Sequence, residues 1–205
     1  MTISLKNIGK RYNYDWIFRH VDFEFSAGNA CVILGPNGSG KSTLLQIIAG
    51  SLTHNEGTVL YRQGEQPIAP ELLHRQLALA APYTELVEEL TLEELFSFQQ
   101  QFKPFLPYLK IDEMMQAVQL GKAGRKQIRY FSSGMKQRAK LALALFADVP
   151  LLLLDEPCAN LDNEGILIYQ QLMEQYRRNR IVIVCSNDEQ EYHFCNQRLH
   201  IQDFK

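Results

Sequence analysis

Cysteine is scarce in this chain, and its four copies stand far apart. They are Cys31, Cys158, Cys185 and Cys195, and no two of them have the C-x-x-C spacing of a zinc or redox motif. Cys31 and Cys185 lie in strand-like apolar runs, where a free thiol packs as a small hydrophobic group. A metal site built on His193 and Cys195 lacks supporting ligand spacing. We therefore expect reduced cysteines and a cytosolic setting.

Long apolar runs and an excess of one charge are also absent. No run approaches the roughly 18 residues that a membrane-spanning helix needs, and the N-terminus lacks the apolar middle section of a signal peptide. With 21 Lys and Arg against 23 Asp and Glu, the formal net charge is −2. This balance argues against a protein that binds nucleic acid non-specifically. We expect an ordinary globular protein without a nucleic-acid partner.

The pattern of apolar residues predicts an α/β fold. The pattern turns helical from about 88 to 135, and a further helix is predicted over 163–179. The uninterrupted apolar runs 151–154 and 181–185 are typical of strands buried on both faces of a parallel sheet, and 198–202 predicts another strand. Earlier segments between turn residues predict strands at 2–8, 21–25, 30–35 and 57–62. The expected fold is a mainly parallel sheet with an N-terminal antiparallel β portion and a helical insertion.

Several residues mark the expected helix ends. Thr91 and Glu94 have the spacing of a capping box. Asp112 is expected to cap the following helix, and Gly121 to end it. Gly50 is the expected C-cap of an earlier helix, whose buried side should comprise Leu44, Leu45, Ile47 and Ile48.

The stretch GPNGSGKST matches the phosphate-binding pattern G-x-x-x-x-G-K-[ST], with a predicted strand before it and a helix after it. Its glycines let the backbone curl around phosphates. Lys41 is expected to reach the β- and γ-phosphates, and Ser42 to bind Mg²⁺. The predicted nucleotide-binding residues are Gly35, Pro36, Asn37, Gly38, Ser39, Gly40, Lys41, Ser42 and Thr43.

Two acids follow the apolar run 151–154. Asp155 is placed to hold Mg²⁺, and Glu156 to orient or deprotonate an attacking water. A strand that ends in solvated acids is common by itself. In combination with Lys41 and Ser42, the pair predicts ATP hydrolysis.

A second anion site is suggested by FSSGM at residues 131–135. Serines at a helix start, next to free backbone N–H groups, can hold a phosphate. The alternative is a simple helix cap in which Ser132 or Ser133 accepts those N–H groups.

Together these motifs resemble the ATPase subunit of an ATP-binding cassette (ABC) transporter over essentially the whole chain. FSSGM resembles the family signature L-S-G-G-Q: Ser132 and Gly134 match, whereas Phe131, Ser133 and Met135 depart. The resemblance implies a single ABC ATPase domain over 1–205. Its core would comprise about 1–83 and 137–205, with a helical subdomain at about 84–136.

The resemblance also assigns further nucleotide contacts. Tyr12 stands where the family places the aromatic residue that stacks on adenine, with Tyr14 and Trp16 as alternatives. Asp162 ends the NLD segment, which matches the loop that crosses to a partner subunit. In this family two subunits meet head to tail, and each ATP lies between one phosphate loop and the other chain's signature segment, here including Ser133, Gly134 and Met135.

The resemblance implies a set of partners and a location. We expect ATP and Mg²⁺ as ligands, and a homodimer or a heterodimer with another cassette. An integral membrane permease, encoded separately, would dock near Tyr83 and the helical insertion. The chain would then be cytoplasmic and peripheral on the inner face of the cell membrane.

Two positions depart from the family pattern. Tyr83 stands where the family has a Gln that contacts Mg²⁺ and water, and a phenol is a poorer metal ligand. Asn187 replaces a His that grips the γ-phosphate; it can donate a hydrogen bond but cannot become cationic. Glu156 and Asn187 remain the expected catalytic residues, with slow hydrolysis.

Two alternatives remain open. A nucleotide-gated dimerisation module with little hydrolysis is favoured by Tyr83 and Asn187 and opposed by Glu156. A non-transport ABC protein acting on nucleic acid or ribosomes is opposed by the single cassette and by the absence of sustained heptads between Lys41 and Ser132.

Overall fold

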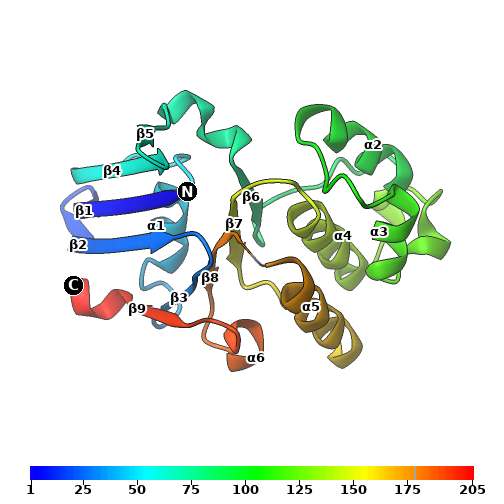
Figure 1. The fold of residues 1–205 in the computed structure, drawn as a ribbon. Helices are drawn as coiled ribbons and strands as arrows, with labels where there is room; N and C mark the ends of the chain where they lie inside the picture. The colour runs from blue at the N-terminus through cyan, green and yellow to red at the C-terminus, as the bar shows by residue number, and fades with distance from the viewer. Residues whose placement is uncertain (178) are drawn as a thin grey trace.

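The computed structural model, which describes residues 1–177 and 179–205, contains two β-sheets: a parallel sheet in the middle of the molecule and an antiparallel sheet at one end (Figure 1). The antiparallel sheet has the order β2-β1-β4-β5, and its strands are β1 (Thr2–Tyr12), β2 (Asp15–Ser26), β4 (Glu56–Gln63) and β5 (Gln66–Pro67). The parallel sheet has the order β6-β7-β8-β3-β9, and its strands are β3 (Ala30–Leu34), β6 (Leu77–Ala80), β7 (Leu151–Asp155), β8 (Ile181–Cys185) and β9 (Gln197–His200). The predicted fold class, a parallel sheet with an antiparallel portion before it, is confirmed.

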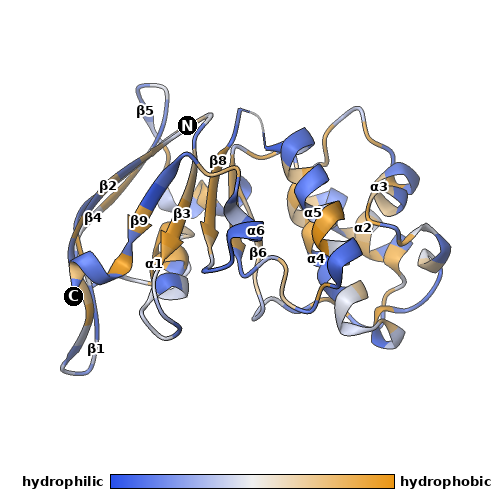
Figure 2. Ribbon diagram, turned by 90° about the horizontal axis from the view of Figure 1, so that it is seen from below, coloured by the Kyte–Doolittle hydropathy of each residue, from blue (hydrophilic) through white to orange (hydrophobic). Residues whose placement is uncertain are grey.

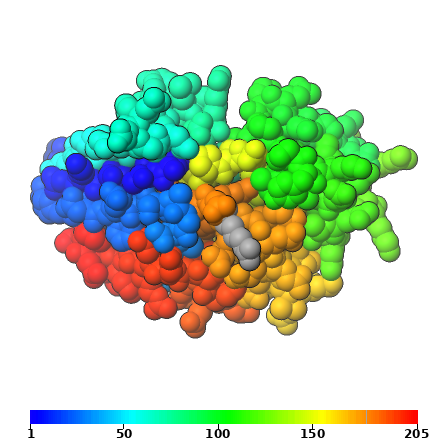
Figure 3. All heavy atoms as spheres, in the orientation of Figure 1, coloured from blue at the N-terminus to red at the C-terminus, as the bar shows by residue number. Residues whose placement is uncertain are grey.

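Helices cover the parallel sheet on both faces (Figures 1 and 2). The α-helices are α1 (Lys41–Ile48), α2 (Leu92–Phe102), α3 (Ile111–Ala117), α4 (Ser133–Leu145), α5 (Asn163–Tyr176) and α6 (Glu189–Tyr192). Short 3₁₀ segments are η1 (Pro70–Arg75), η2 (Gly121–Ala123), η3 (Ile128–Tyr130) and η4 (Ile201–Phe204). In the space-filling view, the green segment that carries α2 and α3 gathers at one end of the molecule, opposite the β-rich N-terminal residues (Figure 3).

Each central strand contributes apolar residues to two separate cores. In β7, Leu151 and Leu153 join the core that contains α1 and the antiparallel sheet. Leu152 and Leu154 join the core that contains the helical insertion, α4 and α5. Because successive side chains of a strand point to opposite faces, a strand covered on both faces needs an unbroken apolar run. The run 151–154 is therefore a consequence of burial on two sides.

The helix that follows the phosphate loop is buried between the two sheets. Leu44, Leu45, Ile47 and Ile48 are all buried in the core shared with the antiparallel sheet. Helix α4, in contrast, packs in the core on the other face of the parallel sheet. The phosphate loop and the signature segment consequently begin helices on opposite sides of one sheet.

One predicted helix start is confirmed and another is wrong. The Thr91–Glu94 capping box is present at the start of α2. Helix α3 begins at Ile111 after Lys110, whose backbone N–H donates to Glu113 at 2.9 Å, so Asp112 lies in the first turn and is not the cap.

The C-terminal ends of α3, α1 and α5 can also be compared with the predicted ones. Helix α3 ends at Ala117, before Gly121, because Gln119 already takes a left-handed backbone with φ 55°. Ala49 is the C-cap of α1, and Gly50 follows it with φ 73°. Of the helix predicted over 163–179, α5 covers Asn163–Tyr176, and position 178 lies outside the described residues.

Among the described residues, no helix combines the length and the apolar character needed to cross a membrane.

Candidate active site

The phosphate loop, Tyr83, Asp155, Glu156 and Asn187 follow the carboxyl ends of four neighbouring parallel strands. Strand β3 leads into the phosphate loop, β6 precedes Tyr83, β7 ends at Asp155, and β8 precedes Asn187. Adjacent strands pair in parallel, with Asp155 opposite Cys185 and Ile33 opposite the same residue. The carboxyl edge of a parallel sheet is the usual place for a ligand. The topology therefore brings together residues that are far apart in the sequence.

The phosphate loop needs glycine at both ends. Gly35 has φ 153°, and a Cβ there would lie 2.5 Å from Ile201 Cγ2. Gly40 has φ 107°, and a Cβ there would lie 2.5 Å from Ile17 Cγ2. Helix α1 begins directly after Gly40 without a side-chain cap. Its first backbone N–H groups are therefore left for a ligand, as an anion-binding helix start requires.

Lys41 lies inside the loop. Its ammonium donates to the backbone carbonyl oxygens of Gly35 at 2.6 Å and of Pro36 at 3.2 Å. The side chain is buried. Ser39 Oγ is also buried, and it has no hydrogen-bond partner among the described residues. The loop thus holds a buried cation and an unpartnered hydroxyl, which fits a phosphate ligand.

A cavity of about 270 Å³ opens beside the loop. Its lining residues are Tyr12, Ile17, Asn37, Gly38, Gly40, Lys41, Ser42, Thr43 and Glu156. The cavity brings together the predicted adenine contact, the phosphate loop and the predicted catalytic acid.

The three candidate stacking aromatics differ in their surroundings. Tyr12 lines the cavity and is 48% exposed. Two guanidinium groups already lie over the Trp16 ring, from Arg19 at 4.3 Å and from Arg11 at 5.5 Å. Tyr14 is 92% exposed at the hairpin between β1 and β2. Lys10 Nζ also lies over the Tyr12 ring, 4.9 Å from its centroid, so a cation over the ring does not separate Tyr12 from Trp16. Tyr12 lines the cavity, whereas Tyr14 and Trp16 do not, and the cavity therefore favours Tyr12 for stacking on adenine.

Asp155 lies at the buried end of β7. Its side chain is 2% exposed, and burial raises its pKa, whereas a hydrogen bond with Ser42 and the charge of Lys41 oppose that rise. A hydroxyl and a carboxylate side by side form the all-oxygen ligand set that Mg²⁺ prefers. Ser42 and Asp155 therefore fit the metal predicted for them.

Glu156 is exposed and starts a turn in an unusual conformation. Its φ is 45°, in the left-handed region. Its backbone N–H donates to the Cys185 carbonyl at 2.9 Å, and its own carbonyl accepts from the Ala159 N–H at 3.0 Å. The backbone on both sides of Glu156 is thus held, and the carboxylate lines the cavity beside the loop.

The two departures from the family pattern lie next to the loop. Burial raises the pKa of Tyr83 to about 12, with a hydrogen bond to Gln46 opposing the rise and the charge of Asp155 adding to it. Asn187 Oδ1 accepts the backbone N–H of Gly35 at 3.3 Å. Both side chains are therefore close to the residues that would hold phosphate and metal.

The signature segment is separate from this cavity. Ser132 is the N-cap of α4, and its hydroxyl accepts the Met135 N–H at 3.2 Å. Ser133 lines a different groove together with Asn160. A Cβ on Gly134 would lie 3.0 Å from the Asn160 carbonyl oxygen, so a larger residue would be crowded. The helix-cap interpretation of Ser132 is correct for a single chain.

Asp162 has a similar structural contact. It is the N-cap of α5, where its carboxylate accepts the Gly165 N–H at 2.8 Å. It does not line the cavity beside the phosphate loop.

Three polar side chains tie the site together and have no motif that sequence reasoning used. Gln137 Nε2 donates to the Pro157 carbonyl at 2.7 Å. Lys140 Nζ lies 3.4 and 3.3 Å from the carbonyl oxygens of Ala81 and Pro82. Glu191 Oε1 accepts the Cys158 N–H at 2.7 Å. Gln137 lies two residues after the signature segment 131–135, whereas Lys140 and Glu191 belong to none of the motifs named above.

Within 1–177 and 179–205, no three His, Cys, Asp or Glu side chains are grouped so as to hold a metal ion. His193 is partly exposed on the surface near Glu174, as expected.

Comparisons with known proteins agree with this geometry. The family model described as "ABC transporter" matches residues 18–159. The chain is 32% identical to the cytochrome c biogenesis ATP-binding export protein CcmA of Brucella abortus, over 91% of this chain and 85% of that protein. It is 27% identical to the lantibiotic transport ATP-binding protein SrtF of Streptococcus pyogenes, over 98% of this chain and 84% of that protein.

A solved structure shows the same fold. An ATP-binding protein of an ABC transporter from Pyrococcus furiosus superimposes with a TM-score of 0.83 at 19% identity, over the whole of both chains. The family model matches more than half of the chain, which therefore belongs to the ABC transporter family as an ATP-binding ATPase.

Proposed function

We propose that two cassette subunits meet head to tail around ATP, and that hydrolysis at this interface powers a separate membrane permease. One observation supports the proposed head-to-tail dimer. The phosphate loop and the signature segment begin helices on opposite faces of the parallel sheet, and they line different hollows. A single chain that uses both on the same phosphate would have to bring them together, whereas a second chain can supply the missing one.

Each residue of the first chain has a role in this proposal. Tyr12 stacks on adenine, and the backbone N–H groups of 35–43 hold the phosphates. Lys41 exchanges its loop carbonyl contacts for the β- and γ-phosphates. Ser42 and Asp155 hold Mg²⁺, which would neutralise charge on the phosphate oxygens. Glu156 accepts a proton from, or orients, the attacking water, while Asn187 donates a hydrogen bond to the γ-phosphate.

The partner chain completes the site. Ser132, Ser133, Gly134 and Met135 start its α4. The Met135 N–H is taken by the Ser132 hydroxyl, so the N–H groups of Ser133 and Gly134 would be the ones to meet a phosphate at this helix start. The Ser132 hydroxyl can keep its cap contact through oxygen while its O–H donates to the γ-phosphate. Asp162, two residues after Asn160, would lie on the segment that crosses the interface. The partner is a second copy of this chain or another cassette.

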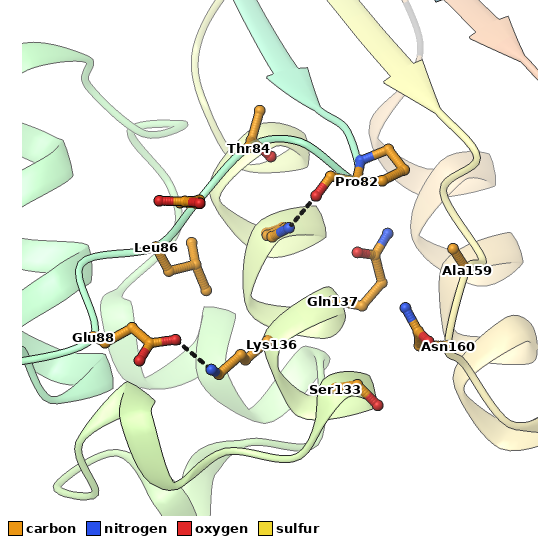
Figure 4. A pocket seen from close by; sticks show the side chains of 11 residues that line it. Pro82, Thr84, Leu86, Glu88, Ser133, Lys136, Gln137, Ala159 and Asn160 are labelled. Atoms are coloured by element: carbon orange, nitrogen blue, oxygen red, sulfur yellow. Dashed lines mark hydrogen bonds and ion pairs between the residues drawn. The ribbon is translucent and has the colours of Figure 1, made fainter.

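The permease would dock against the segment 82–88, beside Tyr83, and leave the start of α4 and residues 159–160, on the other side of the same groove, to the partner subunit. This groove has a volume of about 490 Å³ and lies where the segment 82–88, the start of α4 and the residues 159–160 meet (Figure 4). The ion pair between Lys136 and Glu88 crosses it. Docking there would place the chain in the cytoplasm, on the inner face of the membrane. The transport roles in the names of CcmA and SrtF support this assignment.

A second candidate is a nucleotide-gated module that closes on ATP but scarcely hydrolyses it. Tyr83 favours it, because a phenol of raised pKa beside Asp155 is a weak ligand for Mg²⁺ and a weak partner for water. Glu156 opposes it, because its carboxylate lines the nucleotide cavity.

Size-exclusion chromatography of Glu156→Gln tests the proposal. This variant should bind ATP without turning it over, so it should elute as a dimer with Mg-ATP and as a monomer without it. Phosphate release by the parent protein separates the two candidates. A monomer at saturating ATP would refute homodimerisation, and mixing with other cassette subunits would then test a heterodimer. A dimer with no phosphate release by the parent would favour the nucleotide-gated module.

A further inference from the structure

A buried carboxylate lies behind the catalytic turn. Glu191, in α6, is 5% exposed, and burial raises its pKa, whereas hydrogen bonds from Ser186 and from the Cys158 N–H oppose that rise. A buried charge is costly unless hydrogen bonds compensate for it. The contacts of this carboxylate should therefore matter for the structure around it.

The carboxylate binds the turn that carries Glu156. Glu191 Oε1 accepts the backbone N–H of Cys158 at 2.7 Å. A bond from an N–H to a charged acceptor is short and strong. Cys158 follows Glu156 by one intervening proline, so this bond fixes the end of the turn on which Glu156 stands.

The same residue belongs to the segment that carries Asn187. The Glu191 backbone N–H donates to the Asp188 carbonyl at 3.0 Å, and the Asp188 N–H donates to Ser186 Oγ at 2.9 Å. Asn187, between those two residues, accepts the Gly35 N–H of the phosphate loop. Glu191 is thus bonded to the Glu156 turn on one side and to the Asn187 segment on the other.

We propose that Glu191 is a positioning residue for hydrolysis: its buried carboxylate holds the 156–158 turn against the Asn187 segment, and so fixes Glu156 relative to the phosphate loop. Catalytic geometry is sensitive at this scale, because a misplacement of about 1 Å can cost on the order of 10²-fold in rate. The left-handed backbone of Glu156 is a second reason why this turn must be held in place, because such a conformation persists only where its surroundings stabilise it. The effect on turnover rests on the proposed function.

Three variants separate positioning from simple packing. Glu191→Met keeps the approximate volume but removes the acceptor, so kcat should fall roughly 10- to 100-fold while the Kd for ATP changes less than about 3-fold. Glu191→Gln keeps an acceptor oxygen and should retain kcat within about 3-fold. The control is Tyr169→Phe, which removes the bond from the Tyr169 hydroxyl to the Glu191 backbone carbonyl, 2.7 Å long, without touching Cys158.

A second measurement does not depend on turnover. Hydrogen–deuterium exchange of the Cys158 amide should become faster in Glu191→Met and stay slow in Glu191→Gln and Tyr169→Phe. If the parent hydrolyses no ATP but this exchange pattern is found, the proposed hydrolysis fails and the structural clamp stands. Unchanged exchange in Glu191→Met would overturn the clamp. Equal losses of kcat in Glu191→Met and Tyr169→Phe, at equal losses of thermal stability, would overturn the positioning role.

Discussion

The two helix starts that could hold phosphate differ in how their backbone N–H groups are used. Helix α1 follows Gly40 in a left-handed conformation and has no side-chain cap. Helix α4 follows Ser132, whose hydroxyl accepts the Met135 N–H. The start of α1 therefore has no N–H group taken by a side-chain cap, whereas at the start of α4 one N–H group, that of Met135, is taken by Ser132.

This difference indicates how the two sites would act in sequence. The loop at 35–43 can bind nucleotide in a single chain, because its N–H groups and Lys41 converge on one cavity. The signature segment is exposed at Ser132 and Ser133, and its cap makes it stable without a ligand. We infer that nucleotide binds the phosphate loop first and that the partner's signature segment joins afterwards.

The largest expected effect is that of Glu156→Gln, which should separate ATP binding from ATP hydrolysis. Glu156→Gln removes the carboxylate that would act on water, so turnover should fall by about 10²- to 10⁴-fold while ATP affinity is retained. Steady-state phosphate release and equilibrium binding measure the two quantities. Glu164→Gln, an exposed acid in the first turn of α5, is the control and should behave like the parent. A Glu156→Gln protein that hydrolyses ATP normally would contradict the role of Glu156.

Lys41→Ala should weaken ATP binding at the start of α1 and leave the start of α4 unchanged. A lost hydrogen bond between charged groups costs about 1.5–3 kcal/mol, so the Kd for ATP should rise by roughly 10- to 150-fold. Fluorescence titration with a labelled ATP analogue measures this shift. Lys122→Ala, an exposed lysine in η2, should leave the Kd unchanged. Equal affinities in Lys41→Ala and the parent would contradict the nucleotide site itself.

Asn187→His should increase a slow basal rate. A hydrogen bond to the transition state from a group that can become cationic is worth on the order of 3 kcal/mol, so the gain should reach up to about 10²-fold. Tyr83→Gln in the same chain should raise the gain further, because both side chains would face one γ-phosphate and act non-additively.

Steady-state phosphate release from the parent, Asn187→His, Tyr83→Gln and the double variant decides this point. A parent as fast as ordinary cassette ATPases, with no gain in either His-containing variant, would show that Asn187 is no handicap. No turnover in any of the four proteins would favour the nucleotide-gated module.

Ser132→Ala should have the smallest effect, and it tests whether Ser132 does more than cap α4. Losing an N-cap costs about 1 kcal/mol of unfolding free energy, and Thr91→Ala, which removes the cap of α2, is the matched control. Only Ser132→Ala should also weaken ATP-driven dimerisation, by about 10-fold in the dimer Kd. Analytical ultracentrifugation in a Glu156→Gln background measures it. Equal dimerisation in both variants would mean that Ser132 is a cap only.

The sequence predicted the parts of the fold that depend on local pattern. The runs 151–154 and 181–185 are strands because burial on two faces demands continuous apolar residues, and the loop glycines are needed for backbone shape. Asp112 was wrong as a cap because the Lys110 N–H is satisfied from within α3, by Glu113. Glu191 was missed because its burial comes from tertiary packing of α6 against α5 and the turn after β7, which no short motif records.

The separation of the two helix starts was predictable only through the family resemblance. Nothing in the spacing between Lys41 and Ser132 indicates that their helices lie on opposite faces of the sheet. That placement arises from the order of the strands, with β3 between β8 and β9 and β7 next to β8. Sheet order depends on contacts between distant segments and leaves little trace in local sequence.

The left-handed backbone of Glu156 sets stability against activity at a single position. A residue with a side chain in this conformation costs about 1–3 kcal/mol, and glycine would remove much of that strain. Glu156→Gly is therefore expected to melt at a higher temperature than the parent while losing hydrolysis. A search for thermostable variants without a test of ATP turnover would select this substitution. Such a search would therefore remove the catalytic carboxylate while relieving the backbone strain.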